Sequence, residues 1–170
     1  MIEHLKEQIQ EEAKKQIISN GYSKTTIRSV ATACRIGVGT LYNYFRSKDE
    51  LITSFMLDDW RMCVERMEEA ASADTEAFLR GIQKALSDFI DNYQNLFRDE
   101  DAIRAFASVF SKRHAQLRGK IADIISPVFD KTEFEDKRFL SEHVAESIIN
   151  WSMEGIPFDK QFSIIQKIIL

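Results

Sequence analysis

"RIGVGTLYNYFRSK", Arg35–Lys48, is the stretch on which the interpretation of this sequence depends. It holds three basic residues and no acidic one, in a 170-residue chain with a formal net charge of -4. Extended back to Lys14, the segment carries seven of the 23 Lys and Arg and none of the 27 Asp and Glu. Positive charge focused in one segment of an acidic protein indicates a polyanionic partner. A solvated helix face gives the same local bias, so residue spacing must separate the two interpretations.

Composition indicates an all-α protein. The chain is 44% hydrophobic, with two Pro and six Gly, and its apolar residues recur three or four positions apart. About nine helices are expected. No run approaches the roughly 18 apolar residues of a membrane span, and no secretory leader is visible, so a cytoplasmic protein without a membrane partner is expected. Cys34 and Cys63 stand alone, so we expect no disulfide, no metal site and no cofactor.

Helical periodicity divides the N-terminal part into short elements. A first helix should end at Gly21, which supplies a C-terminal stop, and two short helices should cover residues 27–34 and 38–46. Ser47 followed three residues later by Glu50 predicts a capping box and the start of a long helix. A first helix followed by two short helices that a tight turn joins fits a helix-turn-helix unit. A plain αα-hairpin has the same pattern.

Further along the chain, the pattern predicts two separate helices over residues 102–110 and 112–125, ended by Pro127. A later helix should stop at Gly155, and a last one should cover Phe158–Leu170.

The second of the two short helices, residues 38–46, has an unusual outward face. On a helical wheel, Leu41 and Phe45 share one side, while Gly39, Thr40 and Asn43 point away from it. A merely soluble helix would carry Glu, Lys or Arg there, and Gly in a helix interior costs about 1 kcal/mol relative to Ala. Close approach of another backbone, such as DNA, explains the small and hydrogen-bonding side chains.

Two strings at these positions, "TTIRSVA" (Thr25–Ala31) and "GTLYNYFRSKDELI" (Gly39–Ile52), resemble the TetR family of bacterial transcriptional regulators. The resemblance implies a homodimer with a helix-turn-helix DNA-binding domain over residues 1–46. It also implies an effector-binding and dimerisation domain over residues 47–170.

The wheel and the resemblance together predict a set of DNA-binding residues. They are Thr26, Arg28, Gly37, Val38, Gly39, Thr40, Tyr42, Asn43, Tyr44 and Lys48. Lys48 lies in the first turn of its helix, where the macrodipole disfavours a cation, and a phosphate would remove that conflict. Two positions depart from the family pattern. Arg35 replaces the usual Gly at a turn that often needs a left-handed residue, and Gly37 replaces a polar N-cap residue. A distorted turn and reduced DNA affinity are expected, while Arg35 adds positive charge.

No spacing of Ser, His, Asp or Cys suggests a catalytic set, so we expect the protein not to be an enzyme. Twelve Phe and two Trp remain to be explained, as core residues or as the lining of a pocket for a small apolar or aromatic effector. The predicted pocket residues are Phe55, Trp60, Phe78, Ile82, Phe89, Tyr93, Phe106, Phe110 and His114. Tyr93 and His114 are the expected polar anchors.

The last two helices carry more apolar surface than one small monomer covers, which predicts a homodimer. The predicted interface residues are Leu140, Val144, Ile148, Trp151, Phe162, Ile165 and Ile169. Two-fold symmetry would present two recognition helices to a palindromic double-stranded operator.

The sequence therefore predicts a ligand-responsive transcriptional regulator, a repressor released from its operator by a small apolar effector. Two alternatives stay open at this point. One is a helical interaction protein that has lost operator binding, which the departures at Arg35 and Gly37 favour. The other is a carrier of lipids or metabolites that uses only the aromatic pocket.

Overall fold

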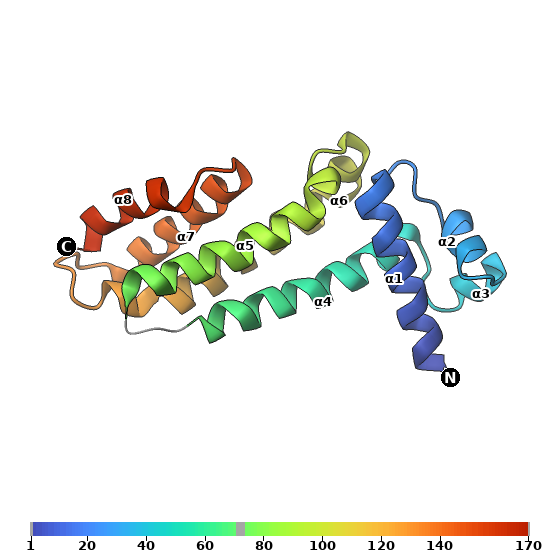
Figure 1. The fold of residues 1–170 in the computed structure, drawn as a ribbon, viewed down its shortest axis with the longest axis horizontal. Coiled ribbons are helices and arrows are strands. Elements are labelled where there is room, and N and C mark those ends of the chain that lie inside the picture. The colour runs from blue at the N-terminus through green and yellow to red at the C-terminus, as the bar shows by residue number, and fades with distance from the viewer. Residues whose placement is uncertain (1, 71–73, 170) are drawn as a thin grey trace. The chain divides into compact units, whose positions relative to one another are not determined.

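The computed structural model describes residues 2–70 and 74–169, apart from the side chains of residues 2, 3 and 108–113, and all its regular elements in these ranges are helices (Figure 1). The elements are α1 (Ile2–Asn20), α2 (Ile27–Ala33), α3 (Val38–Tyr42), α4 (Lys48–Glu69), α5 (Thr75–Phe97), α6 (Glu100–Ile125), a 3-10 turn η1 (Ser126–Phe129), α7 (Lys137–Met153) and α8 (Phe158–Ile169). The predicted all-α class is confirmed. Within the described ranges, no helix combines the length and apolar character needed to cross a bilayer.

The chain forms two compact units, and the first comprises Met1–Arg61 and Asn92–Ala107. Its buried side chains from α1 to α4 include Ile9, Ala13, Ile17, Val30, Ala31, Leu41, Phe45, Leu51 and Ile52. The unit extends past the predicted domain boundary at residue 46, because the first turns of α4 contribute Leu51 and Ile52 to the buried set. A division of function between residues 1–46 and 47–170 stays a prediction.

The ends of α1 and α4 follow the expected signals. Gly21 has φ +80°, and its N–H donates to the carbonyl of Ile17 (2.9 Å), which stops α1. At the start of α4, the Ser47 hydroxyl accepts the N–H of Glu50 (3.0 Å). The Glu50 carboxylate accepts the N–H of Arg46 (2.7 Å), one residue before the position expected in a capping box.

Two of the predicted elements are wrong. Residues 100–125 form the single helix α6 instead of two helices, because no Pro or Gly between residues 102 and 118 interrupts the hydrogen-bond ladder. The helix α3 ends at Tyr42 and does not reach residue 46. The N–H groups of Asn43 and Tyr44 bond to carbonyls three residues back (3.2 and 3.0 Å), which closes a tighter turn.

One partly buried carboxylate joins three helices of the first unit. The carboxylate of Asp59 on α4 accepts a hydrogen bond from the Tyr93 hydroxyl on α5 (2.5 Å) and pairs with Lys14 on α1 (2.6 Å). Burial, with the hydrogen bond and negative charge of Asp59, raises the pKa of Tyr93 far above its usual range. The Tyr93 hydroxyl therefore remains a proton donor to Asp59 at all physiological pH values.

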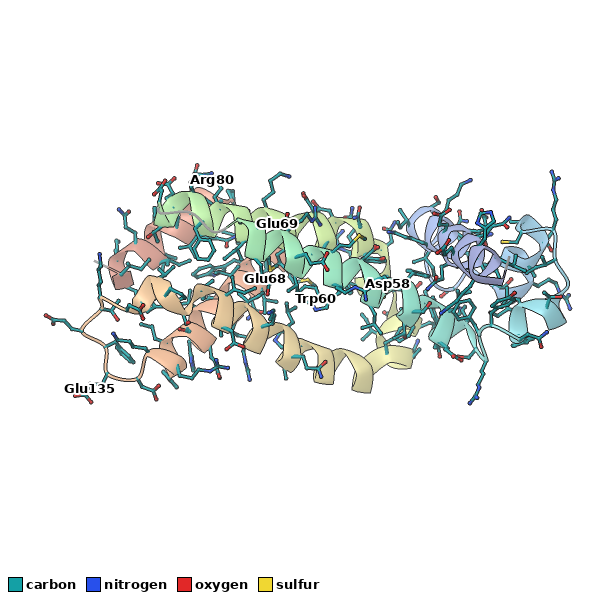
Figure 2. The ribbon with its side chains drawn as sticks, turned by 90° about the horizontal axis from the view of Figure 1, so that it is seen from below. Asp58, Trp60, Glu68, Glu69, Arg80 and Glu135 are labelled. Atoms are coloured by element: carbon teal, nitrogen blue, oxygen red, sulfur yellow. The ribbon has the colours of Figure 1, made fainter. Side chains whose placement is uncertain are left out.

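The second unit comprises Met62–Asp91 and Ser108–Leu170. Its buried apolar side chains include Met67, Phe78, Leu79, Ile82, Leu86, Ile121, Ile125, Phe129, Leu140, Val144, Ile148 and Ile165. Arg80, labelled on α5 in Figure 2, pairs with Asp159 of α8 (2.9 Å) and lies over the ring of Phe158, 4.2 Å from its centroid. This contact attaches α8 to α5, and the aromatic face adds to an ion pair that solvent would otherwise weaken.

The end of α4 approaches α5 closely at Gly81. A Cβ added to Gly81 would lie 2.6 Å from the Cβ of Ala70, closer than two carbon atoms can approach, whereas a Cβ on Gly119 of α6 would meet nothing within 4 Å. Gly81→Ala should therefore destabilise the protein by about 1–2 kcal/mol, since overpacking exceeds the gain in helix propensity. Gly119→Ala should stabilise it by about 0.5–1 kcal/mol. Urea unfolding of both variants measures these changes in the free energy of unfolding. If both variants changed stability in the same direction, the close approach at Gly81 would be contradicted.

Candidate nucleic-acid interface

The helix α2 begins with a reciprocal cap. The Thr26 hydroxyl accepts the N–H of Ser29, and the Ser29 hydroxyl oxygen accepts the N–H of Thr26, both at 3.0 Å. The Ser29 hydroxyl donates to Gln16 of α1 (2.7 Å), which ties the cap to the preceding helix. The N-terminal end of α2 is thus held in place before any ligand binds.

The turn between α2 and α3 is a Schellman motif. The N–H of Arg35 bonds to the carbonyl of Thr32 and the N–H of Ile36 to that of Ala31, both at 3.0 Å. Arg35 has φ 57°, the left-handed conformation expected at this position. Gly155 occupies the equivalent position after α7, with φ 70°, so the chain contains the same motif with and without a side chain.

Arg35→Gly should stabilise the protein by up to about 1 kcal/mol, because Gly adopts the left-handed conformation without the steric cost of a Cβ. It should also weaken DNA binding slightly by removing a positive charge. Arg35→Ala separates these effects, since it removes the charge and keeps the strain. Chemical denaturation checks the stabilities, and Gly155→Ala should lower stability in the same assay. If Arg35→Ala stabilised the protein relative to wild type and Arg35→Gly destabilised it, the argument from backbone strain at Arg35 would be refuted.

The surface of α3 matches the predicted wheel. Leu41 is 0% and Phe45 2% exposed, whereas Tyr42 is 50% exposed and Gly39, Thr40 and Asn43 are exposed. Gly37 is the N-cap and supplies no side-chain hydrogen bond. A Cβ on Gly39 would meet nothing within 4 Å, so packing inside the protein gives no reason for glycine there.

Residues from α2, α3 and α4 meet at an open groove. Its lining is Thr25, Thr26, Ile27, Arg28, Val38, Tyr42 and Lys48. Five of these belong to the predicted DNA-binding set: Thr26, Arg28, Val38, Tyr42 and Lys48. The remaining members, Gly37, Gly39, Thr40, Asn43 and Tyr44, follow along α3 and the turn after it. Sequence reasoning therefore selected five residues that line one groove, and a DNA-binding role for the whole set stays a prediction.

Lys48 has a partner that the sequence did not reveal. Its ammonium donates to the carbonyl of Tyr22 (3.0 Å) and lies 3.4 Å from the centroid of the Tyr22 ring. Partial burial lowers the pKa of Lys48, while the carboxylates of Asp49, Asp99 and Asp101 act in the opposite direction. Because an ammonium has three donors, two N–H groups remain beyond the one that Tyr22 accepts.

Tyr22 is a residue that sequence reasoning missed. Its hydroxyl donates to Asp49 (2.7 Å), and its ring meets Phe106 edge to face, with centroids 5.7 Å apart. Burial and the hydrogen bond to Asp49 raise the pKa of Tyr22 above its usual range, so the hydroxyl stays a donor. No periodic signal identifies this residue, because it stands in a turn and its partners come from distant parts of the chain.

The exposed cations around α2 and α3 differ in pairing from many cations elsewhere in the described part of the chain. In the described part of the first unit, Lys24, Arg28, Arg35 and Arg46 are exposed and form no ion pair. In the second unit, six cations pair with carboxylates: Arg66, Arg80, Lys84, Arg118, Lys120 and Arg138. The positive charge around α2 and α3 is therefore not neutralised within the protein, which suits a surface that meets phosphates.

The predicted effector residues fall in both units. Phe55, Tyr93 and Phe106 are buried in the first unit, where Trp60 is half-buried on α4 (Figure 2). Phe78 and Ile82 are buried and Phe89 is half-buried in the second unit, and the side chain of Phe110 lies outside the described residues.

Neither of the two expected polar anchors is free. The Tyr93 hydroxyl is bound to Asp59, and the imidazole Nε2 of His114 on α6 lies 2.8 Å from the carboxylate of Glu146 on α7. These side chains hold helices together, so a role for them in binding an effector would require breaking an existing contact.

Four of the seven predicted dimer residues are buried within a single chain, and the interface itself stays a prediction. Leu140, Val144, Ile148 and Ile165 are buried in the core of the second unit itself, and Trp151, Phe162 and Ile169 are only half-buried. The exposed large apolar residues of α7 and α8 are Phe139, Met153, Ile164 and Ile168. The helix α8 is amphipathic, and its apolar face includes Phe158 and Ile165, which are both buried. The sequence identified this face but did not reveal that it packs within the unit.

A helix-turn-helix with an uncompensated positive surface is the arrangement typical of helical DNA-binding regulators. Residues 9–54 match the family described as "Bacterial regulatory proteins, tetR family". The match covers α2, α3 and the turn between them. The N-terminal part of this chain is therefore similar to the DNA-binding part of TetR-family regulators.

Two curated relatives match over about a third of the chain. The Fatty acid metabolism regulator protein of Bacillus subtilis is 32% identical over 62 residues, which cover 36% of this chain and 32% of that protein. The HTH-type transcriptional regulator UidR of Escherichia coli is 34% identical over 58 residues, which cover 34% of this chain and 30% of that protein. This chain thus spans about a third of the length of the curated relatives it matches.

Solved structures match over nearly the whole chain. A transcriptional regulator from Cytophaga hutchinsonii has a TM-score of 0.70 at 19% identity, covering 96% of this chain and 93% of that one. FadR of Thermus thermophilus, in complex with lauroyl-CoA, has a TM-score of 0.57 at 18% identity, covering 96% and 92%. At these identities the likeness shows a shared fold.

Proposed function

We propose that the protein is a ligand-responsive DNA-binding transcriptional regulator that represses transcription until a small apolar effector releases it. The observation that carries the proposal is the set of exposed, unpaired cations beside a groove lined by Thr26, Arg28, Tyr42 and Lys48. Phosphate contacts supply most of the affinity for DNA, and the outward face of α3 offers short polar groups to base edges.

Titration of the protein against duplex DNA from its own promoter tests the proposal. Fluorescence anisotropy should show tighter binding to the promoter than to a scrambled duplex, with an affinity that falls as salt rises. Equal and weak binding to both duplexes would instead favour a helical interaction protein that has lost operator binding, as the strained Arg35 and the uncapped Gly37 allow.

We further propose that the protein acts as a homodimer through α7 and α8, as the exposed apolar residues on these helices indicate. The contact would use Phe139, Met153, Ile164 and Ile168 in place of the buried residues predicted from sequence. Two-fold symmetry would then match a palindromic operator.

The proposed effector is small and apolar, and Phe78, Ile82 and Phe89 of the second unit are the candidate lining. Ligand sites in helical bundles are mostly apolar with few polar groups. Lauroyl-CoA, lauric acid and free CoA are suitable first probes, because one structure of the same fold carries lauroyl-CoA. A probe that binds should release promoter DNA and raise the melting temperature. Release by free CoA alone would contradict an apolar effector.

A further inference from the structure

Residues 21–26 form the turn that connects α1 to α2, and this turn adjoins the DNA-facing groove. Thr25 and Thr26 line the groove, and the Thr25 hydroxyl donates to the carbonyl of Gly21 (2.9 Å). The carbonyl of Tyr22 in the same turn accepts the ammonium of Lys48, another lining residue (3.0 Å). The position of the 21–26 turn therefore sets where the Lys48 ammonium lies.

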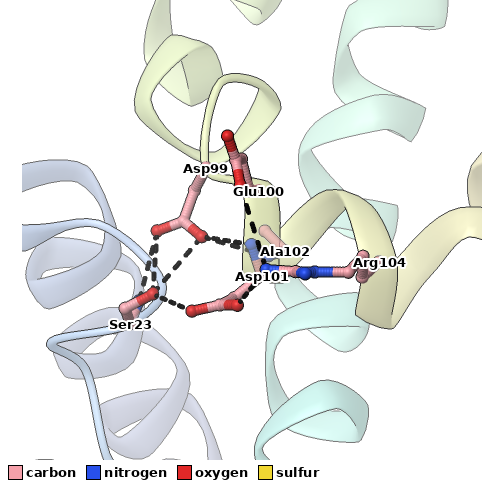
Figure 3. A network of polar contacts seen from close by, with 6 residues as sticks. All are labelled: Ser23, Asp99, Glu100, Asp101, Ala102 and Arg104. Carbon is pink, nitrogen blue, oxygen red and sulfur yellow. Dashed lines mark hydrogen bonds and ion pairs between the residues drawn. The ribbon is translucent and has the colours of Figure 1, made fainter.

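A segment more than 70 residues away holds this turn in place, as Figure 3 shows. The N–H of Ser23 donates to Asp99 (3.3 Å), and the Ser23 hydroxyl lies 3.2 Å from Asp99 and 3.0 Å from Asp101. Asn95 of α5 donates to the carbonyl of Ile18 near the end of α1 (3.0 Å). All of these residues belong to the first compact unit.

Asp99 also caps α6. Its carboxylate accepts the N–H groups of Asp101 (3.0 Å) and Ala102 (3.1 Å). Partial burial acts to raise the pKa of Asp99, but the hydrogen bonds from Ala102, Ser23 and Asp101 lower it overall. The carboxylate thus stays ionised and bonds to the turn and to α6 at once. A Cβ on Gly21 would lie 3.7 Å from Asp99, which places the carboxylate against the turn.

We propose that Asp99 is a positioning residue for DNA binding, which acts through the 21–26 turn and the Tyr22 carbonyl on Lys48. The carboxylate orders the turn before DNA arrives, so that less freedom is lost when the groove meets a phosphate. This inference rests on the proposed function, since it concerns the geometry of the same groove. It assigns a role in DNA recognition to a residue outside the helix-turn-helix.

The test breaks the contact between Ser23 and Asp99 in two ways. Ser23→Ala removes the hydroxyl donor and leaves the α6 cap intact, whereas Asp99→Ala removes both. Each variant should bind promoter and scrambled duplex about three- to tenfold more weakly than wild type, as expected for the loss of one or a few hydrogen bonds. In hydrogen exchange, the amide of Ser23 should lose protection in Asp99→Ala.

Asp136→Ala is the matched control, because Asp136 caps α7 through the N–H of Phe139 (2.9 Å) and does not contact the turn. It should lose a similar amount of stability and keep full DNA affinity. A double-mutant cycle shows whether Asp99 acts through Lys48: in a Lys48→Ala background, Asp99→Ala should cost less affinity than it does in wild type.

The outcomes distinguish a failure of the proposed function from a failure of the positioning role of Asp99. If wild type shows no preference for promoter DNA, the proposed function fails, and this inference fails with it. If wild type binds its promoter and Ser23→Ala and Asp99→Ala bind equally well, the positioning role alone is wrong. Additive losses of DNA affinity in the double-mutant cycle would also overturn the positioning role. So would a loss of affinity in Asp136→Ala equal to that in Asp99→Ala.

Discussion

Replacing Ile164 and Ile168 together by Glu is expected to convert the proposed dimer to a folded monomer. These side chains are 49% and 40% exposed on α8, so the substitutions should not disturb the core of the second unit. Two carboxylates on each partner would leave unpaired charges in an apolar contact, which costs far more than the contact contributes. Light scattering at micromolar concentration should show half the mass, and circular dichroism should show unchanged helix content.

The monomer should also bind promoter DNA more weakly. A dimer engages two half-sites, and losing the second one lowers affinity by about 100-fold or more. Ile165→Glu provides the comparison, because Ile165 is the next residue along but only 1% exposed. It should unfold the second unit instead of separating the partners. A double variant that remains a dimer would show that α8 does not form the interface.

Asn43→Ala and Lys48→Ala are expected to weaken DNA binding in different ways. Asn43 is exposed at the C-cap of α3, where its amide can reach a base edge. Asn43→Ala should reduce the preference for the operator by about 1–3 kcal/mol if the amide makes a bidentate base contact, and it should spare binding to random DNA. Lys48→Ala should weaken both duplexes and lower the salt slope by about one, as one phosphate contact is lost.

Affinity for both duplexes across a range of salt concentrations separates these effects. Arg61→Ala is a suitable control, because the Arg61 guanidinium already pairs with Asp58 (2.7 Å) and lies outside the groove. It should leave the salt slope near that of wild type. An unchanged slope in Lys48→Ala would mean that the ammonium stays with Tyr22 when DNA binds. Equal weakening of both duplexes by Asn43→Ala would place α3 in a different orientation in the groove.

Local signals in the sequence determined much of the N-terminal unit. Gly21 ends α1, Ser47 caps α4, and the wheel separated buried Leu41 and Phe45 from the outward face of α3. These features depend on residues within one or two helical turns of each other, so periodicity and capping chemistry are sufficient to predict them. The resemblance also anticipated the left-handed turn at Arg35, because a Schellman motif needs that conformation whatever residue occupies it.

Tertiary structure decided the features that depend on distant partners. The amphipathic sequence of α8 indicates an apolar face, but only packing within the unit showed that this face buries Ile165 in the core and leaves Ile164 exposed. Lys48 met the Tyr22 carbonyl, and Ser23 met Asp99 from 76 positions away, because the fold brings turns together that share no local pattern. A sequence specifies such contacts only through the whole fold, since each hydrogen bond depends on where two separate backbones lie in space.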